Sequence, residues 1–169
     1  MRPRLPEPNK QANSKGEWVL LAFRLPREPS TPRIALWRKL KRLGVAQLLD
    51  GLVALPLDSR NREQLEWLAD DVGEAGGEAT IWIGELATTE QERELVARMR
   101  DAVAGEYLRL IADAGAVRSQ PAGRRRRSLS RLRRELRRVR ERDYFPPPEQ
   151  ELARQAVDGL AEAVEEVTR

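Results

Sequence analysis

The chain has 169 residues, is 40 % hydrophobic and 34 % charged, and carries a formal net charge of +4, which suits one small domain with a helical annex. It contains no cysteine and no histidine. This excludes disulfides and thiolate sites and removes the commonest general base and transition-metal ligand, so no metal and no cofactor are expected.

The chain begins with residues that do not predict a folded element. Residues 1–15 are polar and rich in proline, and they lack the apolar core of a signal peptide, so a disordered lead-in is expected. No later apolar run approaches the roughly 18 residues that span a bilayer. We therefore expect a cytoplasmic protein without membrane contact.

A strand and a helix follow. Residues 17–25 form an almost unbroken apolar run, which is typical of a central strand. Residues 30–44 predict a helix that begins with a Ser-Thr cap and a proline and ends at Gly44. Five apolar residues share one face of this helix and leave the other face cationic: Ile34, Leu36, Trp37, Leu40 and Leu43.

The next elements complete a small sheet. Two apolar runs within residues 45–55 are joined by Asp50-Gly51, a strong hairpin signal. A helix capped by Asp58 or Ser59 comes next, and residues 78–86 are rich in β-branched and aromatic residues, as strands are. The order strand, helix, strand, strand, helix, strand predicts a ferredoxin-like βαββαβ sheet with two helices on one face.

The rest of the chain is predicted to be helical. A helix with overlapping capping boxes covers residues 88–114, and Gly115 begins a loop. A second helix covers residues 128–143, with apolar residues at heptad spacing. A proline-rich elbow at residues 144–148 leads to a last helix over residues 149–167. The fold class is therefore α+β, a ferredoxin-like sheet followed by a three-helix carboxy-terminal extension.

Charge is distributed unevenly over this extension. Residues 124–142 hold eleven arginines and two glutamates, a net charge of +9. Residues 149–169 hold six acids and two arginines, a net charge of −4. Arg124 to Arg127 are expected to precede the second helix, with no acidic counterpart nearby.

Two interpretations of this arginine-rich segment stay open. In the first, the acidic last helix lies beside it and neutralises part of its charge, as in coiled coils. In the second, nucleic-acid phosphates take up the excess, which the bidentate geometry of guanidinium favours. The second interpretation predicts phosphate contacts from this segment and from a second basic patch: Arg124, Arg125, Arg126, Arg127, Arg131, Arg134, Arg138, Arg38, Lys39 and Arg42.

Several motifs also carry a family resemblance. They are the apolar strand after Trp18, Leu25-Pro26, the segment from Trp37 to Gly44, Leu55-Pro56, Trp67-Leu68, Gly76-Gly77-Glu78-Ala79, and Asp143-Tyr144-Phe145-Pro146. Together they resemble the amino-terminal domain of ChrB, a family associated with bacterial chromate-resistance operons. The first part also resembles the ferredoxin-like middle domain of the phenylacetate repressor PaaX.

This resemblance implies a chromate-responsive transcriptional regulator that binds promoter DNA. Longer ChrB proteins have a second, carboxy-terminal domain, and PaaX has a winged-helix segment ahead of its ferredoxin-like part. This chain is expected to lack both, and either missing piece could hold the sensor or the DNA reader. The alternative is a non-enzymatic protein-interaction or oxyanion-sensing module that acts with a separate carboxy-terminal sensor domain.

The residue types argue against catalysis. A metal nuclease on this fold would be expected to place an acid at the end of the first strand, where this chain has Arg24. Chromate or another oxyanion is a possible ligand, because Arg24, Arg27 and Arg33 lie where the first strand leads into a helix amino terminus. In the simpler interpretation, Arg33 packs locally or pairs with Glu28. No enzyme is expected.

The sequence thus predicts a ferredoxin-like domain over residues 16–87, a helical extension over residues 88–169 packed on it, and double-stranded DNA as the partner. A homodimer formed through the sheet or its edge is expected. Four tryptophans are expected in the core rather than stacked on bases: Trp18, Trp37, Trp67 and Trp82.

Overall fold

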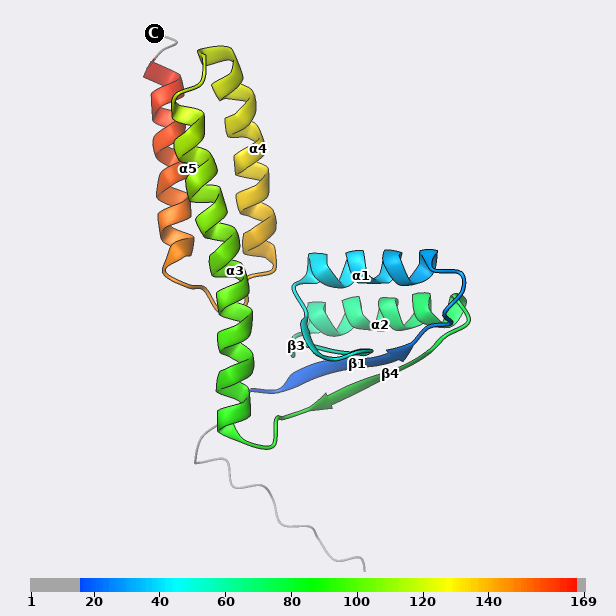
Figure 1. Cartoon of the computed structure of the whole chain (residues 1–169). Helices are drawn as coiled ribbons and strands as arrows, with labels where there is room; N and C mark the ends of the chain where they lie inside the picture. Colours follow the sequence, from blue (N-terminus) through cyan, green and yellow to red (C-terminus); the bar gives the residue numbers. More distant parts are fainter. Residues whose placement is uncertain (1–15, 167–169) are drawn as a thin grey trace, which may run out of the picture.

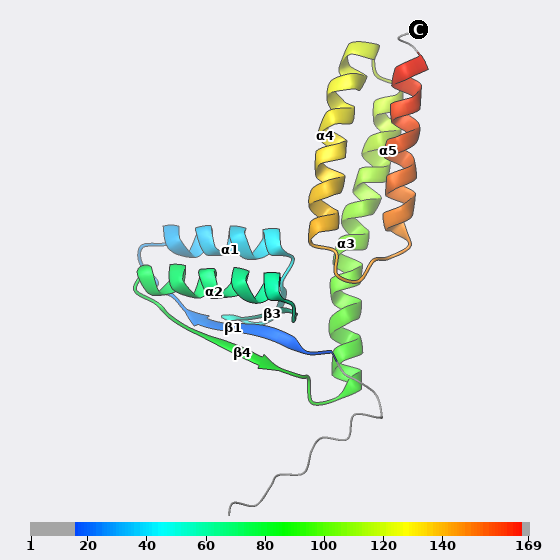
Figure 2. The same cartoon turned by 180° about the vertical axis from the view of Figure 1, so that it is seen from behind.

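The computed structural model describes residues 16–166, which form an α+β fold with a four-stranded antiparallel sheet and five helices (Figure 1). The predicted lead-in, residues 1–15, lies outside the described residues. The sheet lies beside the first half of one long helix, and two further helices accompany that helix beyond the sheet (Figures 1 and 2). The two halves of the chain therefore have separate cores.

The sheet consists of β1 (Trp18–Arg24), β2 (Ala46–Leu49), β3 (Leu52–Pro56) and β4 (Glu78–Gly84). Its spatial order is β2-β3-β1-β4, which differs from the order along the chain because the helices carry the chain across the sheet. The apolar run of β1 lies between β3 and β4, as predicted for a central strand.

The β2–β3 turn confirms the predicted hairpin. Gly51 has φ 77°, a left-handed conformation that favours glycine. It also lies close to β1, since its carbonyl accepts a hydrogen bond of 2.7 Å from the Phe23 amide. A Cβ added at Gly51 would lie 2.4 Å from the Phe23 carbonyl oxygen. Both the turn and the strand contact therefore need a residue without a side chain here.

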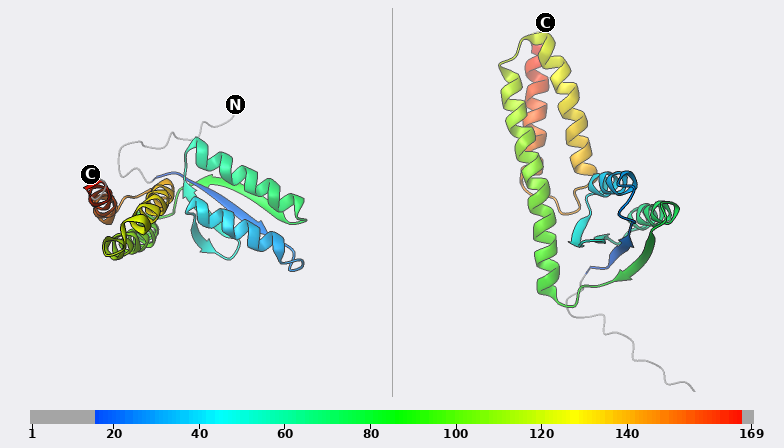
Figure 3. Two further views of the ribbon diagram at one scale, coloured as in Figure 1. Left: turned by 90° about the horizontal axis from the view of Figure 1, so that it is seen from above. Right: turned by 45° about the vertical axis from the view of Figure 1, so that its right-hand side comes forward.

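Helices α1 (Thr31–Leu43) and α2 (Ser59–Glu74) cover one face of the sheet (Figure 3). Ser30 and Asp58 precede them as expected, but only the Asp58 side chain caps its helix, by accepting from the Asn61 amide at 2.6 Å. Ile34, predicted on the apolar face of α1, is half exposed. The core below these helices draws on both layers: Val19, Leu21, Val53, Leu55, Leu36, Leu40, Leu65, Leu68 and Val72.

Helix α3 (Thr89–Arg118) joins the two cores. Its first turns place Leu95, Val96 and Met99 against the other face of the sheet, beside Trp18. Its later turns pack with α4 (Ala122–Glu141) and α5 (Glu149–Glu166) around Tyr107 and Leu132. The predicted end of the helix before Gly115 is wrong, because Val117 is buried in this second cluster and its burial extends the helix.

Helix α4 begins earlier than predicted. Arg124 to Arg127 lie inside its first turns rather than ahead of it, and the Arg124 and Arg125 amides donate to the Pro121 carbonyl at 2.9 and 3.0 Å. Arginine is a strong helix former, so a run of arginines extends a helix that the leucine spacing alone does not mark. Residues 167–169, which include the predicted end of the last helix, lie outside the described residues.

The tryptophan prediction is wrong for two of four residues. Trp18 is buried against Phe145, and Trp37 is partly buried with its ring edge-on to Phe23. Trp67 and Trp82 are instead 56 % and 60 % exposed. Trp82 lies on the sheet face opposite α1 and α2, and Trp67 lies on the side of α2 away from the buried Leu65 and Leu68.

The turn gives a stability prediction. Gly51→Ala forces a left-handed alanine against the Phe23 carbonyl, so the free energy of unfolding is expected to fall by at least about 1–2 kcal/mol. Gly115→Ala is the matched control, because this helical glycine has no neighbour within 4 Å. The control is expected to raise the free energy of unfolding by roughly 0.5–1 kcal/mol. Equal shifts in urea denaturation would contradict the assignment of the turn.

Candidate nucleic-acid interface

Most of the arginines of helix α4 lie at its surface. Its apolar residues Leu129, Leu132, Leu136 and Val139 are buried against α3 and α5. Because these residues occupy a single stripe, the arginines surround the remaining circumference of the helix. Nine of the eleven arginines in residues 124–142 are exposed. The sequence pattern alone therefore dictates that one side of this three-helix unit is covered with guanidinium groups.

Few of these arginines are neutralised within the described residues. The Arg131 guanidinium lies 3.2 Å from the Glu135 carboxylate and 3.6 Å from the Asp113 carboxylate. Arg142 forms a bidentate ion pair with Glu106 of α3. Eight others make no ion pair with a described side chain: Arg124, Arg125, Arg127, Arg133, Arg134, Arg137, Arg138 and Arg140.

Helix α5 lies beside α4, as the first interpretation expects, and the positive charge of Arg140 acts on Glu151. Glu151 and Asp158 both pair with Arg154 of their own helix, at 2.6 and 2.7 Å. Hydrogen bonding to Arg154 lowers the pKa of the Glu151 carboxyl to about 2. These two carboxylates are therefore engaged along α5, and the arginines of α4 keep most of their positive charge.

A groove lies where α4 approaches α1 and α3. It has a volume of about 690 Å³ and is lined by guanidiniums from all three helices, including Arg42, Arg109 and Arg138. Its three carboxylates, at positions 106, 113 and 135, are already paired with Arg131 and Arg142. Arg42 and Arg138 have no ion pair with a described side chain, so the groove offers unpaired guanidiniums to an anion.

The structure separates the predicted phosphate contacts into two places. Arg131, Arg138 and Arg42 line the groove. Arg124 to Arg127 lie at the opposite end of α4, away from the sheet (Figure 1). Lys39 pairs with Asp71 of α2, and Arg38 is exposed on α1 but does not line the groove. Arg134 is exposed on α4.

The predicted oxyanion residues have partners of their own. Arg24 pairs with Glu78 of the neighbouring strand at 2.8 Å, and Arg33 donates to the Pro26 carbonyl at 2.9 Å rather than pairing with Glu28. Arg27 is exposed. Convergence of these three arginines on an oxyanion stays a prediction.

The orientation of α4 is set by a junction with α1. A Cβ added at Gly44, the left-handed cap of α1, would lie 2.7 Å from the Arg142 Cβ and 2.8 Å from its carbonyl oxygen. The Tyr144 hydroxyl donates to the Leu43 carbonyl at 2.7 Å, and burial raises its pKa, which keeps it protonated as a donor. The sequence marked Gly44 as a cap but did not reveal this second role.

A second hydrogen-bonded group holds the elbow after α4. The Asp143 carboxylate accepts from the Tyr107 hydroxyl at 2.8 Å and from the Gln150 amide at 2.9 Å. Burial raises the pKa of the Tyr107 hydroxyl, so this donor stays neutral. The elbow is thereby attached to both α3 and α5.

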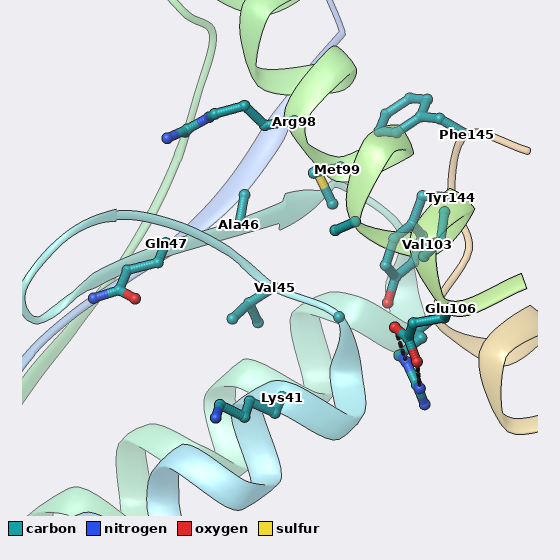
Figure 4. Close-up of a pocket in the computed structure, with 13 residues that line it drawn as sticks. Lys41, Val45, Ala46, Gln47, Arg98, Met99, Val103, Glu106, Tyr144 and Phe145 are labelled. Atoms are coloured by element: carbon teal, nitrogen blue, oxygen red, sulfur yellow. Dashed lines mark hydrogen bonds and ion pairs between the residues drawn. The ribbon is translucent and has the colours of Figure 1, made fainter. Parts of the chain in front are cut away.

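A pocket of about 320 Å³ opens beside this junction (Figure 4). Met99, Val103 and Phe145 form an apolar side, and the Glu106–Arg142 pair lies at one end. Lys41 and Arg98 lie toward its rim (Figure 4). With its ion pair already satisfied, the pocket has no convergent set of reactive groups.

The comparisons with known proteins decide the family. Residues 33–122 match the model of the family described as Protein ChrB, N-terminal, which is more than half of the chain. The chain belongs to this family. The match begins inside α1, after β1, and covers β2 to β4, α2, α3 and the first residue of α4, so the arginine-rich helix lies almost wholly beyond it. The ChrB part of the predicted resemblance is confirmed.

The chain is also similar in sequence to a ChrB protein. The chain is 29 % identical over 133 residues to Protein ChrB of Cupriavidus metallidurans. The aligned part covers 76 % of this chain and 40 % of the relative, so the chain spans less than half of that protein's length. No solved structure matches the chain.

The described residues contain neither a membrane-spanning helix nor a cluster of metal ligands. No described helix is long and apolar enough to cross a membrane. Within residues 16–166, no group of three or more acidic side chains is placed to hold a metal ion.

The junction gives a prediction about stability. Tyr144→Phe leaves the Leu43 carbonyl without its partner, so the free energy of unfolding is expected to fall by about 1–2 kcal/mol. Leu108→Ala, at an exposed position of α3, is the control and is expected to stay within about 0.5 kcal/mol of the parent. Urea denaturation measures both, and an unchanged midpoint for Tyr144→Phe would show that this hydrogen bond does not hold the junction.

Proposed function

We propose that the chain is the DNA-binding part of a transcriptional regulator of the chromate-resistance type. The observation that carries the proposal is the set of eight α4 arginines without an ion pair to a described side chain. Like charges this close destabilise a helix, and a polyanion relieves that repulsion. The proposal includes no catalytic step.

The two groups of arginines are assigned complementary roles. Arg124 to Arg127 supply phosphate contacts at the far end of α4, and Arg42, Arg131 and Arg138 supply them at the groove. All of these arginines except Arg42 lie on α4, and the Gly44–Arg142 contact holds the carboxyl end of α4 against α1, which carries Arg42. The two groups therefore bind the duplex as one surface. Phosphate contacts fix position on DNA but do not read its sequence.

The finer fold assignment belongs to the same proposal. We assign residues 16–87 to the ferredoxin-like class, and we keep the PaaX-like relationship as part of the proposal on the resemblance of this part of the sequence. The support is the alternation of strands and helices with both helices on one sheet face. A homodimer formed through an edge of this sheet is also proposed, and sedimentation at increasing protein concentration tests it.

An oxyanion ligand is a further part of the proposal. Chromate or a similar dianion would bind Arg24, Arg27 and Arg33, and it would have to compete with Glu78 for the first of these. Calorimetric titration with chromate, and with sulfate as the control anion, tests this. Equal heats for the parent and for Arg27→Ser/Arg33→Ser would contradict the site.

The alternative function uses the same surface. The chain spans 40 % of the length of its ChrB relative, which leaves room in that protein for a further domain. In this alternative, the arginines of α4 dock an acidic protein or a carboxy-terminal sensor domain instead of DNA. Binding to an acidic polypeptide without any preference for promoter DNA would favour it.

Duplex titration at several salt concentrations tests the DNA proposal. The logarithm of the binding constant is expected to fall with the logarithm of salt concentration, with a slope of about −0.9 per neutralised phosphate. Replacing Arg124, Arg125, Arg126 and Arg127 by serine is expected to weaken binding and to flatten that slope by up to about 4.

Two single substitutions test the contribution of the groove between α4, α1 and α3 to DNA binding. Arg42→Ser and Arg138→Ser are each expected to flatten the salt slope by about 1. Arg93→Ser removes an exposed charge near the opposite end of α3 and is the matched control, expected to leave the slope unchanged. If the control and the groove variants change the slope equally, the binding is general attraction to a basic protein and not contact at this surface.

A further inference from the structure

Trp67 is an exposed aromatic residue beside the proposed phosphate-binding surface. It lies on α2 and lines a shallow groove of about 430 Å³ between α1 and α2, together with Lys39, Arg42 and Gln64. A tryptophan with more than half of its side chain exposed contributes little to the core and leaves a large apolar face in water. Exposed apolar surface of this kind often marks a binding site.

The rest of the sheet domain does not use this ring. Two other tryptophans pack with aromatic partners, Trp18 with Phe145 and Trp37 with Phe23, but no described aromatic ring stacks on Trp67. The buried residues of α2 include Leu65 and Leu68, which face the sheet. The indole of Trp67 therefore points away from the core, toward the outer surface of α1 and α2.

The neighbouring groups are those that suit a nucleotide. Arg42 lines both this groove and the larger groove beside α4, so the two grooves share this side chain. Lys39 is held in place by its pair with Asp71. The Gln64 side chain forms no hydrogen bond to a described residue, and its amide offers both a donor and an acceptor.

We propose that Trp67 stacks on an unpaired base of a nucleic-acid strand whose phosphates are held by Arg42 and the arginines of α4. This inference rests on the proposed DNA binding and adds to it an aromatic contact with a base. The indole provides the stacking surface, and the Gln64 amide reaches the edge of the base. Stacking of this kind is tolerant of sequence, because every base has a π face.

A base fits this groove better than an apolar peptide does. Lys39 and Asp71 neutralise each other, so Arg42 is the cation in this lining that favours a negatively charged group next to a flat ring. A strand bound along the α4 groove brings phosphates to Arg42, and the base attached there lies next to Trp67. The occupant is therefore an unpaired nucleotide at the end of, or within, a bound duplex.

The experiment compares a blunt duplex with the same duplex carrying a single-stranded 3′ extension. Trp67→Ala is expected to weaken binding of the extended DNA by about 5- to 150-fold, the range expected for loss of one stacked base. Binding of the blunt duplex is expected to change much less. Trp82→Ala, which removes the other highly exposed tryptophan from the opposite sheet face, is the matched control and is expected to bind both DNAs like the parent.

Fluorescence gives a second readout that does not depend on affinity. The extended DNA is expected to quench tryptophan emission in the parent and in Trp82→Phe, and this quenching is expected to disappear in Trp67→Phe. Circular dichroism and urea denaturation of each variant check that it folds. Equal affinities of the parent and Trp67→Ala for the extended DNA, or quenching that persists in Trp67→Phe, would overturn the stacking role.

The outcomes separate this inference from the DNA proposal. If the serine variants at Arg124 to Arg127 lose binding while Trp67→Ala does not, the DNA proposal stands and the stacking role falls. If the parent protein binds neither DNA, both fall together. Loss at Trp67→Ala of equal size for blunt and extended DNA would also count against an unpaired base.

Discussion

The close contact between Gly44 and Arg142 is the constraint on which the candidate site depends. Because Gly44 has no side chain, the end of α4 can contact the end of α1. The Tyr144 hydroxyl also donates a hydrogen bond to the Leu43 carbonyl at this end of α1. This contact brings Arg42 of α1 beside Arg138 of α4. Residues nearly a hundred positions apart thereby form one cationic groove, and the sheet domain becomes part of the proposed interface.

The position of the charge on α4 follows from burial. Its leucines form the inner stripe of a three-helix unit, so its arginines have no place except the surface. Packing stabilises the helix against the repulsion among them, and ion pairs with described acids relieve part of it at Arg131 and Arg142. The same arrangement that folds the chain leaves a surface that attracts polyanions.

Local signals in the sequence were informative where a single residue type is required by geometry. Asp50-Gly51, Gly44 and Asp58 mark a turn, a helix end and a cap, and each is found in that role. The helix limits were harder to predict, because Gly115 gives no sign of the burial that carries α3 past it, and the leucine spacing of α4 does not show that the arginine run before it is helical. Trp67 and Trp82 were misplaced, since periodicity shows the face of an element but not whether another element covers it.

The uninterrupted course of α3 has a mechanical consequence. Its 30 residues span roughly 45 Å, and the cluster against the sheet ends near Met99 while the three-helix cluster begins near Val103. Between them the helix is uninterrupted, so the number of residues in this interval fixes the rotation of one core relative to the other. One residue inserted there would rotate the three-helix unit by about 100° relative to the sheet and would move Arg138 away from Arg42. The spacing between the two clusters thus determines which arginines lie on the same side of the molecule.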